Sequence, residues 1–133
     1  MTDRDQSRSK LPPATILLVE DEEVVRDFLS SILELDGHSV EAVPHGGAAL
    51  AFLSRHDVDL VLADCLMPVM DGCQLHSVLR QRHDPLADRM VLISGDMERD
   101  PVRTYLRKHS VVTLQKPFGA AELRAVLARV IAR

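Results

Sequence analysis

The stretch Ile16-Leu17-Leu18-Val19-Glu20-Asp21 joins four apolar residues directly to two acidic ones. Three later apolar runs also end at residues that carry chemistry: 60–63 before Asp64, 90–93 before Ser94, and 111–115 before Lys116. Short, continuous apolar runs are typical of strands that are buried on both faces of a parallel sheet. Because the carboxyl ends of parallel strands lie along one edge, we expect carboxylates, a hydroxyl and an ammonium to gather there.

The segments between these runs predict helices. Apolar residues with the 3.6-residue helical period indicate a helix that ends near Gly37 and covers one face of the sheet. These residues are Val25, Phe28, Leu29, Ile32 and Leu33. The other predicted elements are a strand over 38–43 and helices over 46–55, from 72 onward, over 101–108 and over 120–132. Asp71, and the pair Asp100 and Pro101, are expected to cap the helices that they precede.

Five strands that alternate with five helices predict an α/β domain: a doubly wound, flavodoxin-like parallel sheet with helices on both faces. For this length the expected strand order is 2-1-3-4-5, and ligands bind near the switch point between strands one and three. Residues 1–13 are polar at first and end in Pro12-Pro13, so we expect a flexible N-terminal tail before a domain over residues 14–133.

Composition limits the classes of function. With 133 residues, 46% of them hydrophobic, the chain can form one good core but not two ordinary domains. A net charge of -4 argues against direct DNA binding, because phosphate backbones are held by clustered Lys and Arg. No apolar stretch approaches the roughly 18 residues of a membrane span, and no signal peptide is evident, so we expect a cytoplasmic protein without a membrane partner.

Two smaller patterns allow more than one interpretation. Arg99, Arg103 and Arg107 recur at helical spacing, which indicates a solvated helix face more readily than a surface for an acidic partner. Cys65 and Cys73 are expected to be reduced thiols rather than a disulfide. A zinc site that recruits His76 lacks a fourth ligand.

The acidic residues point to a cation. Several carboxylates held together repel one another unless a metal neutralises them, and oxygen ligands favour Mg²⁺. Glu20 and Asp21 alone are also explained as acids at the amino end of the following helix. Asp64 is not, since no helix directly follows it. Together with Ser94 and Lys116, the acids indicate phosphoryl chemistry, in which a carboxylate acts as nucleophile and a lysine pairs with phosphate oxygens.

From Ile16 to Ile131 the chain resembles the receiver domain of two-component response regulators. Four stretches carry the resemblance: Glu20-Asp21, residues 64–72 (Asp-Cys-Leu-Met-Pro-Val-Met-Asp-Gly), Ser94-Gly95 and Lys116-Pro117-Phe118. It implies a phosphoprotein that accepts its phosphoryl group from a histidine kinase or histidine phosphotransfer protein in a phosphorelay. It also implies that the domain is no enzyme beyond Mg²⁺-dependent self-phosphorylation and self-dephosphorylation.

The resemblance also implies a role for each residue. Asp64 is the expected phosphoacceptor. Asp21, Asp64 and the backbone carbonyl of Leu66 are the expected Mg²⁺ ligands, with Glu20 acting through a metal-bound water. Ser94 would bond the phosphate and Lys116 would pair with its other side. The bond between Lys116 and Pro117 is expected to be cis.

The resemblance implies that the signal leaves through a downstream protein. The chain closes its fold with the last helix, so we expect output by a separate partner, with a possible homodimer through the fourth helix, fifth strand and last helix. One residue departs from the family: Thr113 stands where many members carry an aromatic residue that moves on activation. Tyr105 could substitute for it, but a packed ring is the favoured interpretation.

Two other classes share parts of this pattern. A phosphatase of the haloacid dehalogenase type also uses an aspartyl nucleophile and Mg²⁺, but it requires a second acid at the position where this chain has Leu66. A flavodoxin-like flavin binder shares the topology, but the loop after its first strand must cradle phosphate. Here that loop is Glu20-Asp21-Glu22-Glu23, which would repel phosphate without a metal.

Overall fold

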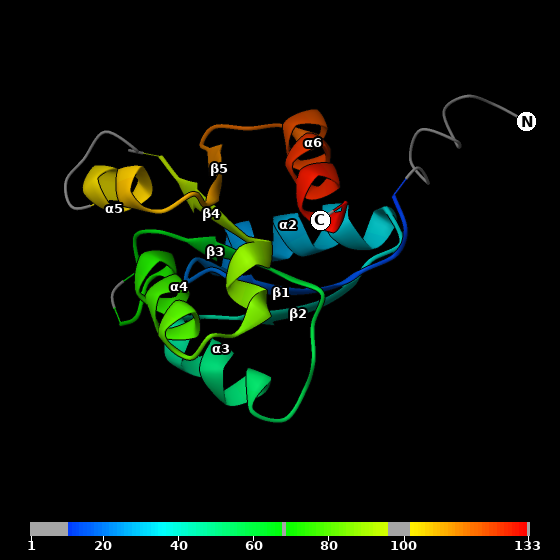
Figure 1. Ribbon diagram of the computed structural model, residues 1–133. Helices are drawn as coiled ribbons and strands as arrows, with labels where there is room; N and C mark the ends of the chain where they lie inside the picture. The colour runs from blue at the N-terminus through cyan, green and yellow to red at the C-terminus, as the bar shows by residue number, and fades with distance from the viewer. Residues whose placement is uncertain (1–10, 68, 96–101, 133) are drawn as a thin grey trace, which may run out of the picture.

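The computed structural model describes residues 11–67, 69–95 and 102–132, over which strands and helices alternate (Figure 1). The elements are β1 (Thr15–Val19), α2 (Glu23–Leu35), β2 (Ser39–Val43), α3 (Gly46–Leu53), β3 (Leu60–Asp64), α4 (Gly72–Gln81), the 3₁₀ helix η1 (Pro85–Arg89), β4 (Met90–Ser94), α5 (Val102–Lys108), β5 (Val112–Gln115) and α6 (Ala120–Ile131). The predicted Asp100–Pro101 cap, Arg99, Pro68 of the 64–72 stretch and the first ten residues of the predicted tail lie outside these ranges.

The five strands form one parallel sheet in the order β2-β1-β3-β4-β5, which confirms the predicted fold class. The register aligns the carboxyl ends: Val19 is level with Ala63, Asp64 with Ile93, and Ser94 with Gln115. From β1 the chain continues to β2 at one side of the sheet, and from β3 it continues to β4 and β5 at the other side. The neighbouring strands β1 and β3 therefore mark the switch point.

Alternate residues of each buried strand supply two separate cores. On one face, α2 and α6 pack against Ile16, Leu18 and their counterparts on the other strands. On the other face, α3, α4, η1 and α5 pack against Leu17, Val19 and the corresponding residues of the other strands. Figure 1 shows α2 and α6 together on one side of the sheet and α3 and α4 on the other. The central strands β1, β3 and β4 are almost entirely apolar because both of their faces are covered.

The helical pattern places Phe28 among the residues of α2 that face the sheet, and for Phe28 this prediction is wrong. Leu29 and Leu33 of α2 are buried as predicted, but 59% of Phe28 is exposed, and Val24 and Leu35 of the same helix are exposed too. The apolar stripe of α2 is wider than the sheet face that it covers. A 3.6-residue period marks every apolar position near the stripe but does not say where contact with the sheet ends.

Local signals fix the ends of the helices. Gly37 has φ +94°, a left-handed conformation that glycine adopts readily, and it ends α2 as predicted. Asp71 caps α4 as predicted: its side chain accepts from Gln74 N–H at 2.9 Å, and Gln74 Oε1 accepts from Asp71 N–H at 3.0 Å. The 3₁₀ helix η1 was not predicted, although Asp84 followed by Pro85 is a helix-start signal, and the Asp84 side chain caps it.

At the amino edge of the sheet, opposite the expected site, His38 is buried. Its Nδ1 accepts a hydrogen bond from Ala14 N–H at 3.0 Å, and its Nε2 has no hydrogen-bond partner among the described residues. Burial lowers the pKa of His38 below the ordinary 6.5, although Asp36 opposes this effect. The folded state therefore disfavours the charged imidazole.

We predict that acid destabilises the fold through His38. Because the folded pKa lies below the unfolded one, the unfolded chain binds more protons once the pH falls below about 6.5, and stability is lost from there down through the folded pKa. Urea unfolding at pH 7 and pH 5 measures this loss in the wild type and in His38→Gln. The variant should lose less stability between the two pH values. An equal loss would show that His38 does not contribute.

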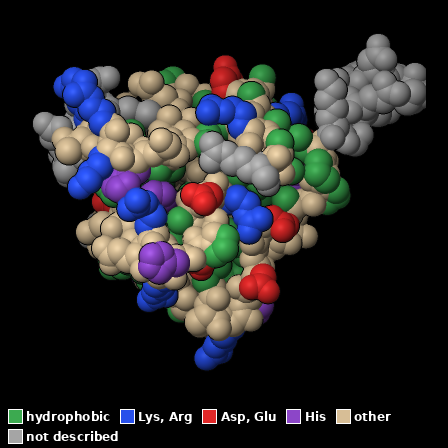
Figure 2. Space-filling model, viewed as in Figure 1, with side chains coloured by type: hydrophobic (Ala, Val, Ile, Leu, Met, Phe, Trp, Pro, Cys, Tyr) green, Lys and Arg blue, Asp and Glu red, His purple; other side chains and the backbone are tan. Residues whose placement is uncertain are grey.

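No helix within the described ranges has the length and apolar character needed to cross a membrane. Lys and Arg side chains occupy several separate places on the face shown in Figure 2, with acidic and histidine side chains among them. Arg103 and Arg107 of α5 are both exposed.

Candidate functional site

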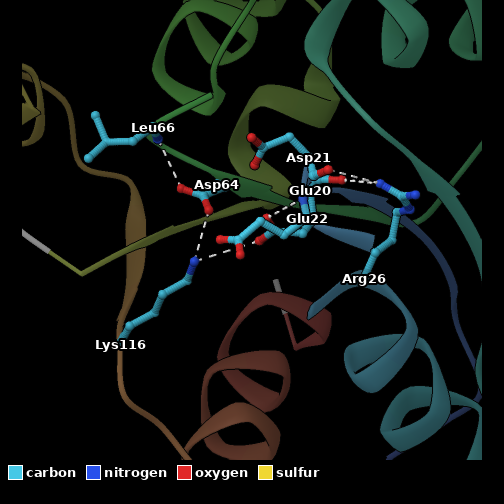
Figure 3. A network of polar contacts seen from close by, with 7 residues as sticks. All are labelled: Glu20, Asp21, Glu22, Arg26, Asp64, Leu66 and Lys116. Atoms are coloured by element: carbon cyan, nitrogen blue, oxygen red, sulfur yellow. Dashed lines mark hydrogen bonds and ion pairs between the residues drawn. The ribbon is translucent and has the colours of Figure 1, made fainter. Parts of the chain in front are cut away.

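Four polar residues lie along the carboxyl edge of the sheet because each is at or just beyond the end of a strand. Glu20 follows β1, Asp64 ends β3, Ser94 ends β4 and Lys116 follows β5. Figure 3 shows Asp64 between Lys116 on one side and the backbone of Leu66 on the other, with the acids after β1 nearby. This edge spans the switch point between β1 and β3.

Three carboxylates form the core of the site. Glu20, Asp21 and Asp64 each offer one oxygen, and these oxygens all lie within 4.8 Å of one another. Glu20 is 1% and Asp64 5% exposed, whereas Asp21 is exposed. Because Glu20 and Asp64 are buried and Asp21 is exposed, solvent reaches the site at Asp21.

Both oxygens of Asp64 are engaged. Lys116 Nζ donates to Oδ2 at 2.9 Å, and Leu66 N–H donates to Oδ1 at 2.9 Å. Desolvation lowers the pKa of Lys116, but the hydrogen bond and the charge of Asp64 outweigh it, so the pKa lies above its ordinary value. Lys116 is therefore a permanent cation whose ammonium lies beside the Asp64 carboxylate.

Of the two buried carboxylates, that of Glu20 has fewer hydrogen bonds to offset its negative charge. Its Oε2 accepts from Glu22 N–H at 3.1 Å, but its Oε1 has no hydrogen-bond partner among the described residues and lies 3.7 Å from Lys116 Nζ. Burial, with a contribution from the charge of Asp64, raises the pKa of Glu20 to about 7. An orphaned buried carboxylate oxygen beside two further carboxylates is the donor set that suits a hard divalent cation such as Mg²⁺.

Backbone contacts hold the two loops that carry these acids. Arg26 of α2 donates from Nη1 to the carbonyl of Glu20 at 2.7 Å and so fixes the turn after β1. On the other side, a Cβ on Gly72 would lie 2.8 Å from the carbonyl oxygen of Asp64, so only glycine lets α4 begin this close to β3. Gly46 N–H donates to the carbonyl of Met70 at 2.8 Å, which ties the loop between β3 and α4 to α3.

The remaining predicted residues lie as follows. Ser94 is fully buried at the end of β4, where its carbonyl accepts from Lys116 N–H at 2.9 Å, and the Lys116–Pro117 bond is cis. Thr113 is half-buried on β5. Tyr105 hydrogen-bonds through its hydroxyl to Nδ1 of His76 on α4 and packs its ring against His109, as the packed-ring interpretation expects.

The zinc interpretation receives no support. Among the residues that the structure describes, Cys73 and His76 belong to no group of three metal-ligating side chains. Both cysteines are free thiols. Sequence reasoning missed Arg26 and the close approach at Gly72. Nothing in the sequence marks Arg26 among the polar residues of its helix, whereas a glycine directly after a capping aspartate was a usable signal.

The sequence matches the response regulator receiver domain family over residues 16–128. The response regulator protein FleR of Pseudomonas aeruginosa is 38% identical over 116 residues, which are 87% of this chain and 24% of that protein. The tetrathionate response regulatory protein TtrR of Salmonella typhimurium is 33% identical over 118 residues, which are 89% of this chain and 56% of that protein. The chain thus spans less than two thirds of the length of these relatives.

Solved structures give the same result. The receiver domain of sensor histidine kinase PA1611 from Pseudomonas aeruginosa, solved with a magnesium ion coordinated in its active-site cleft, is 28% identical. Its TM-score is 0.79, with 92% of this chain and 100% of that one covered. The chemotaxis protein CheY4 of Vibrio cholerae is 27% identical, with a TM-score of 0.75 and 90% and 99% of the two chains covered. The comparisons give no support to a phosphatase or a flavin binder.

Proposed function

This chain belongs to the family of response regulator receiver domains, and from that premise we propose that Asp64 accepts a phosphoryl group from a histidine kinase or histidine phosphotransfer protein. One observation carries the proposal. The Asp64 carboxylate lies at a switch-point edge between the Lys116 ammonium and the Leu66 N–H, within 4.8 Å of two further carboxylates. Residues 14–133 are the proposed receiver domain.

The chain's own groups account for most of the chemistry. An Asp64 oxygen attacks phosphorus, the new bond forms as the bond to the donor's nitrogen or oxygen breaks, and the leaving group takes the electron pair. Lys116 pairs with the oxygens of the entering group, and the Ser94 hydroxyl is proposed to hydrogen-bond to it. Mg²⁺, when held by Asp21, Asp64 and the Leu66 carbonyl with Glu20 beside it, supplies positive charge that offsets the phosphoryl oxygens.

The product should be an acyl phosphate. Incubation of the wild-type chain with Mg²⁺ and acetyl phosphate should add one phosphoryl group per chain, stable in acid and labile in base, because it is bonded to a carboxylate. Intact-mass spectrometry before and after mild base measures it. Incorporation that survives base would indicate a phosphate ester on a hydroxyl and contradict the proposal.

Ser94 and Lys116 are proposed to convert phosphorylation into a change of conformation, since each makes a bond to the phosphoryl group that the unmodified protein lacks. Ser94→Ala and Lys116→Ala should still bind beryllofluoride, a phosphoryl mimic, but with amide shifts confined to the site. The wild type should show shifts that extend into α5. Nuclear magnetic resonance spectra with and without beryllofluoride measure this.

The exposed Gln115, which neighbours Lys116, provides the matched control, and Gln115→Ala should respond as the wild type does. Wild-type shifts in both Ser94→Ala and Lys116→Ala would contradict their roles in switching.

A partner is proposed to read the state of Asp64 on the surface formed by α5, β5 and α6, which adjoins Ser94 and Lys116. The exposed Arg103 and Arg107 of α5 suit an acidic partner or a contact with a second copy, and each exposed pair contributes only a few tenths of a kcal/mol. Because Thr113 has no large ring to swing inward, the change on β5 should be small.

A further inference from the structure

The thiols of Cys65 and Cys73 lie side by side next to the phosphoacceptor. Cys65 is fully buried and follows Asp64 directly, and Cys73 is the second residue of α4. Their Sγ atoms are 3.7 Å apart, within hydrogen-bonding distance, and both thiols are free. A disulfide requires an Sγ–Sγ distance of about 2.05 Å, so an approach of about 1.6 Å would join them.

Only Cys73 is accessible to a reagent from solvent. It is half-buried and lines a cavity of about 600 Å³ between α4 and α5, together with Tyr105 and Lys108. Its place in the first turn of α4 favours a thiolate, because the amino end of a helix carries positive potential. Hydrogen bonding with Cys65 lowers the pKa of Cys73, although burial and the charge of the capping Asp71 oppose this. An open, activated thiol with a second thiol behind it is the arrangement of an oxidisable pair.

We propose that Cys65 and Cys73 form a modification site that a hydroperoxide converts into an intramolecular disulfide, and that this disulfide slows phosphorylation of Asp64. The Cys73 thiolate attacks one peroxide oxygen, the O–O bond breaks, and the hydroxide released leaves as water with the proton of the thiol. Cys65 sulfur then attacks the sulfenic sulfur of Cys73, the S–O bond breaks, and a second water carries off the Cys65 proton. Two thiols and one hydrogen peroxide thus give one disulfide and two waters.

The effect of the disulfide on Asp64 follows from the contacts of Cys65, at the end of β3, and of Gly72, at the start of α4. Cys65 N–H donates to the carbonyl of Ile93 at 2.8 Å, which fixes this end against β4. Gly72 packs against the carbonyl oxygen of Asp64 and fixes the start of α4. Because Leu66 directly follows Cys65, a backbone shift of Cys65 that accompanies the approach of the two sulfurs also moves the Leu66 N–H, which is bonded to Asp64 Oδ1. This second part rests on the proposed function.

The first test needs no phosphorylation. The folded wild type is treated with a modest excess of hydrogen peroxide, remaining thiols are alkylated in denaturant, and intact mass is measured. We expect loss of both thiols with a decrease of about 2 Da, the two thiol hydrogens, reversed by dithiothreitol. Cys65→Ala should instead stop at a sulfenic acid on Cys73 that dimedone traps, and Cys73→Ser should lose its remaining thiol at least about tenfold more slowly.

Oxidation of Cys73 to a sulfinic acid while Cys65 stays reduced would overturn the proposal, as would a disulfide that forms only in denaturant. Circular dichroism confirms that each variant is folded, and Cys65→Ser replaces Cys65→Ala if the latter is not.

The second test compares phosphorylation by acetyl phosphate before and after peroxide. We expect the disulfide form to be at least about tenfold slower, since a displacement of about 1 Å near reacting groups has effects of that size or more. Peroxide-treated Cys65→Ala should be nearly as fast as untreated, which separates the disulfide from oxidation of Met67 or Met70. Equal rates for the two wild-type forms would overturn the proposed control of Asp64. A reduced wild type that takes no phosphate would instead refute the proposed function and leave the disulfide result standing.

Discussion

Asp64→Asn is expected to lower phosphorylation by acetyl phosphate to an undetectable level. The amide has almost the same shape as the carboxylate and keeps one acceptor oxygen for either Lys116 or Leu66, but its NH2 group donates instead of accepting, and it has no anionic oxygen to attack phosphorus. The loss should come without unfolding, because one negative charge is removed from a cluster of mutually repelling acids. Intact-mass spectrometry gives the phosphoryl content, and circular dichroism checks the fold.

The matched control is Asp57→Asn. Asp57 is exposed in the loop before β3, far from the carboxyl edge of the sheet, and this variant should take up phosphate as the wild type does. Incorporation into Asp64→Asn at the level of Asp57→Asn would mean that another residue is the main acceptor.

Removal of Mg²⁺ is expected to have the second largest effect. Without the metal ion, the entering phosphoryl oxygens meet three carboxylates and only one ammonium. Phosphorylation should therefore slow at least about a hundredfold, equivalent to a few kcal/mol of transition-state stabilisation. Mg²⁺ at about five times its dissociation constant should also stabilise the fold by about 1 kcal/mol. Phosphorylation rates and thermal melts with Mg²⁺ or excess chelator measure both effects, at constant ionic strength.

Asp21→Ala should abolish the stabilisation by Mg²⁺ and most of the phosphorylation, and it should be at least as stable as the wild type without metal because one repelling carboxylate is gone. Asp27→Ala, which removes an exposed acid from α2, is the control and should behave as the wild type. A wild-type chain whose melting and phosphorylation both ignore millimolar Mg²⁺ would contradict the assignment of Glu20, Asp21 and Asp64 to a metal site.

Much of this arrangement was predictable because the informative residues lie at strand ends. An apolar run buried on both faces can end only where the sheet ends, so Asp64 and Ser94 were placed at the sheet edge by the same hydrophobic pattern that defined β3 and β4. Asp71 and Gly37 were predictable for a similar reason, since capping and left-handed backbone depend on single residue types.

Other features depend on distances that no local pattern contains. The exposure of Phe28 depends on how far the sheet extends beneath α2, and the unmet Oε1 of Glu20 depends on where Lys116 arrives from β5. The contact of Cys65 with Cys73 arises because Gly72 lets α4 begin against the end of β3. Each follows from packing between elements that the sequence positions only approximately.

Localisation of the phosphoryl group in the wild type decides whether Asp64 is the acceptor. After reaction with acetyl phosphate and Mg²⁺, borohydride reduces the acyl phosphate to a stable alcohol, and peptide sequencing by tandem mass spectrometry identifies the altered residue. We predict that the change lies at Asp64 alone, the carboxylate held between Lys116 Nζ and Leu66 N–H at 2.9 Å each. A change at Glu20, at Asp21 or at any residue away from the carboxyl edge of the sheet would contradict it.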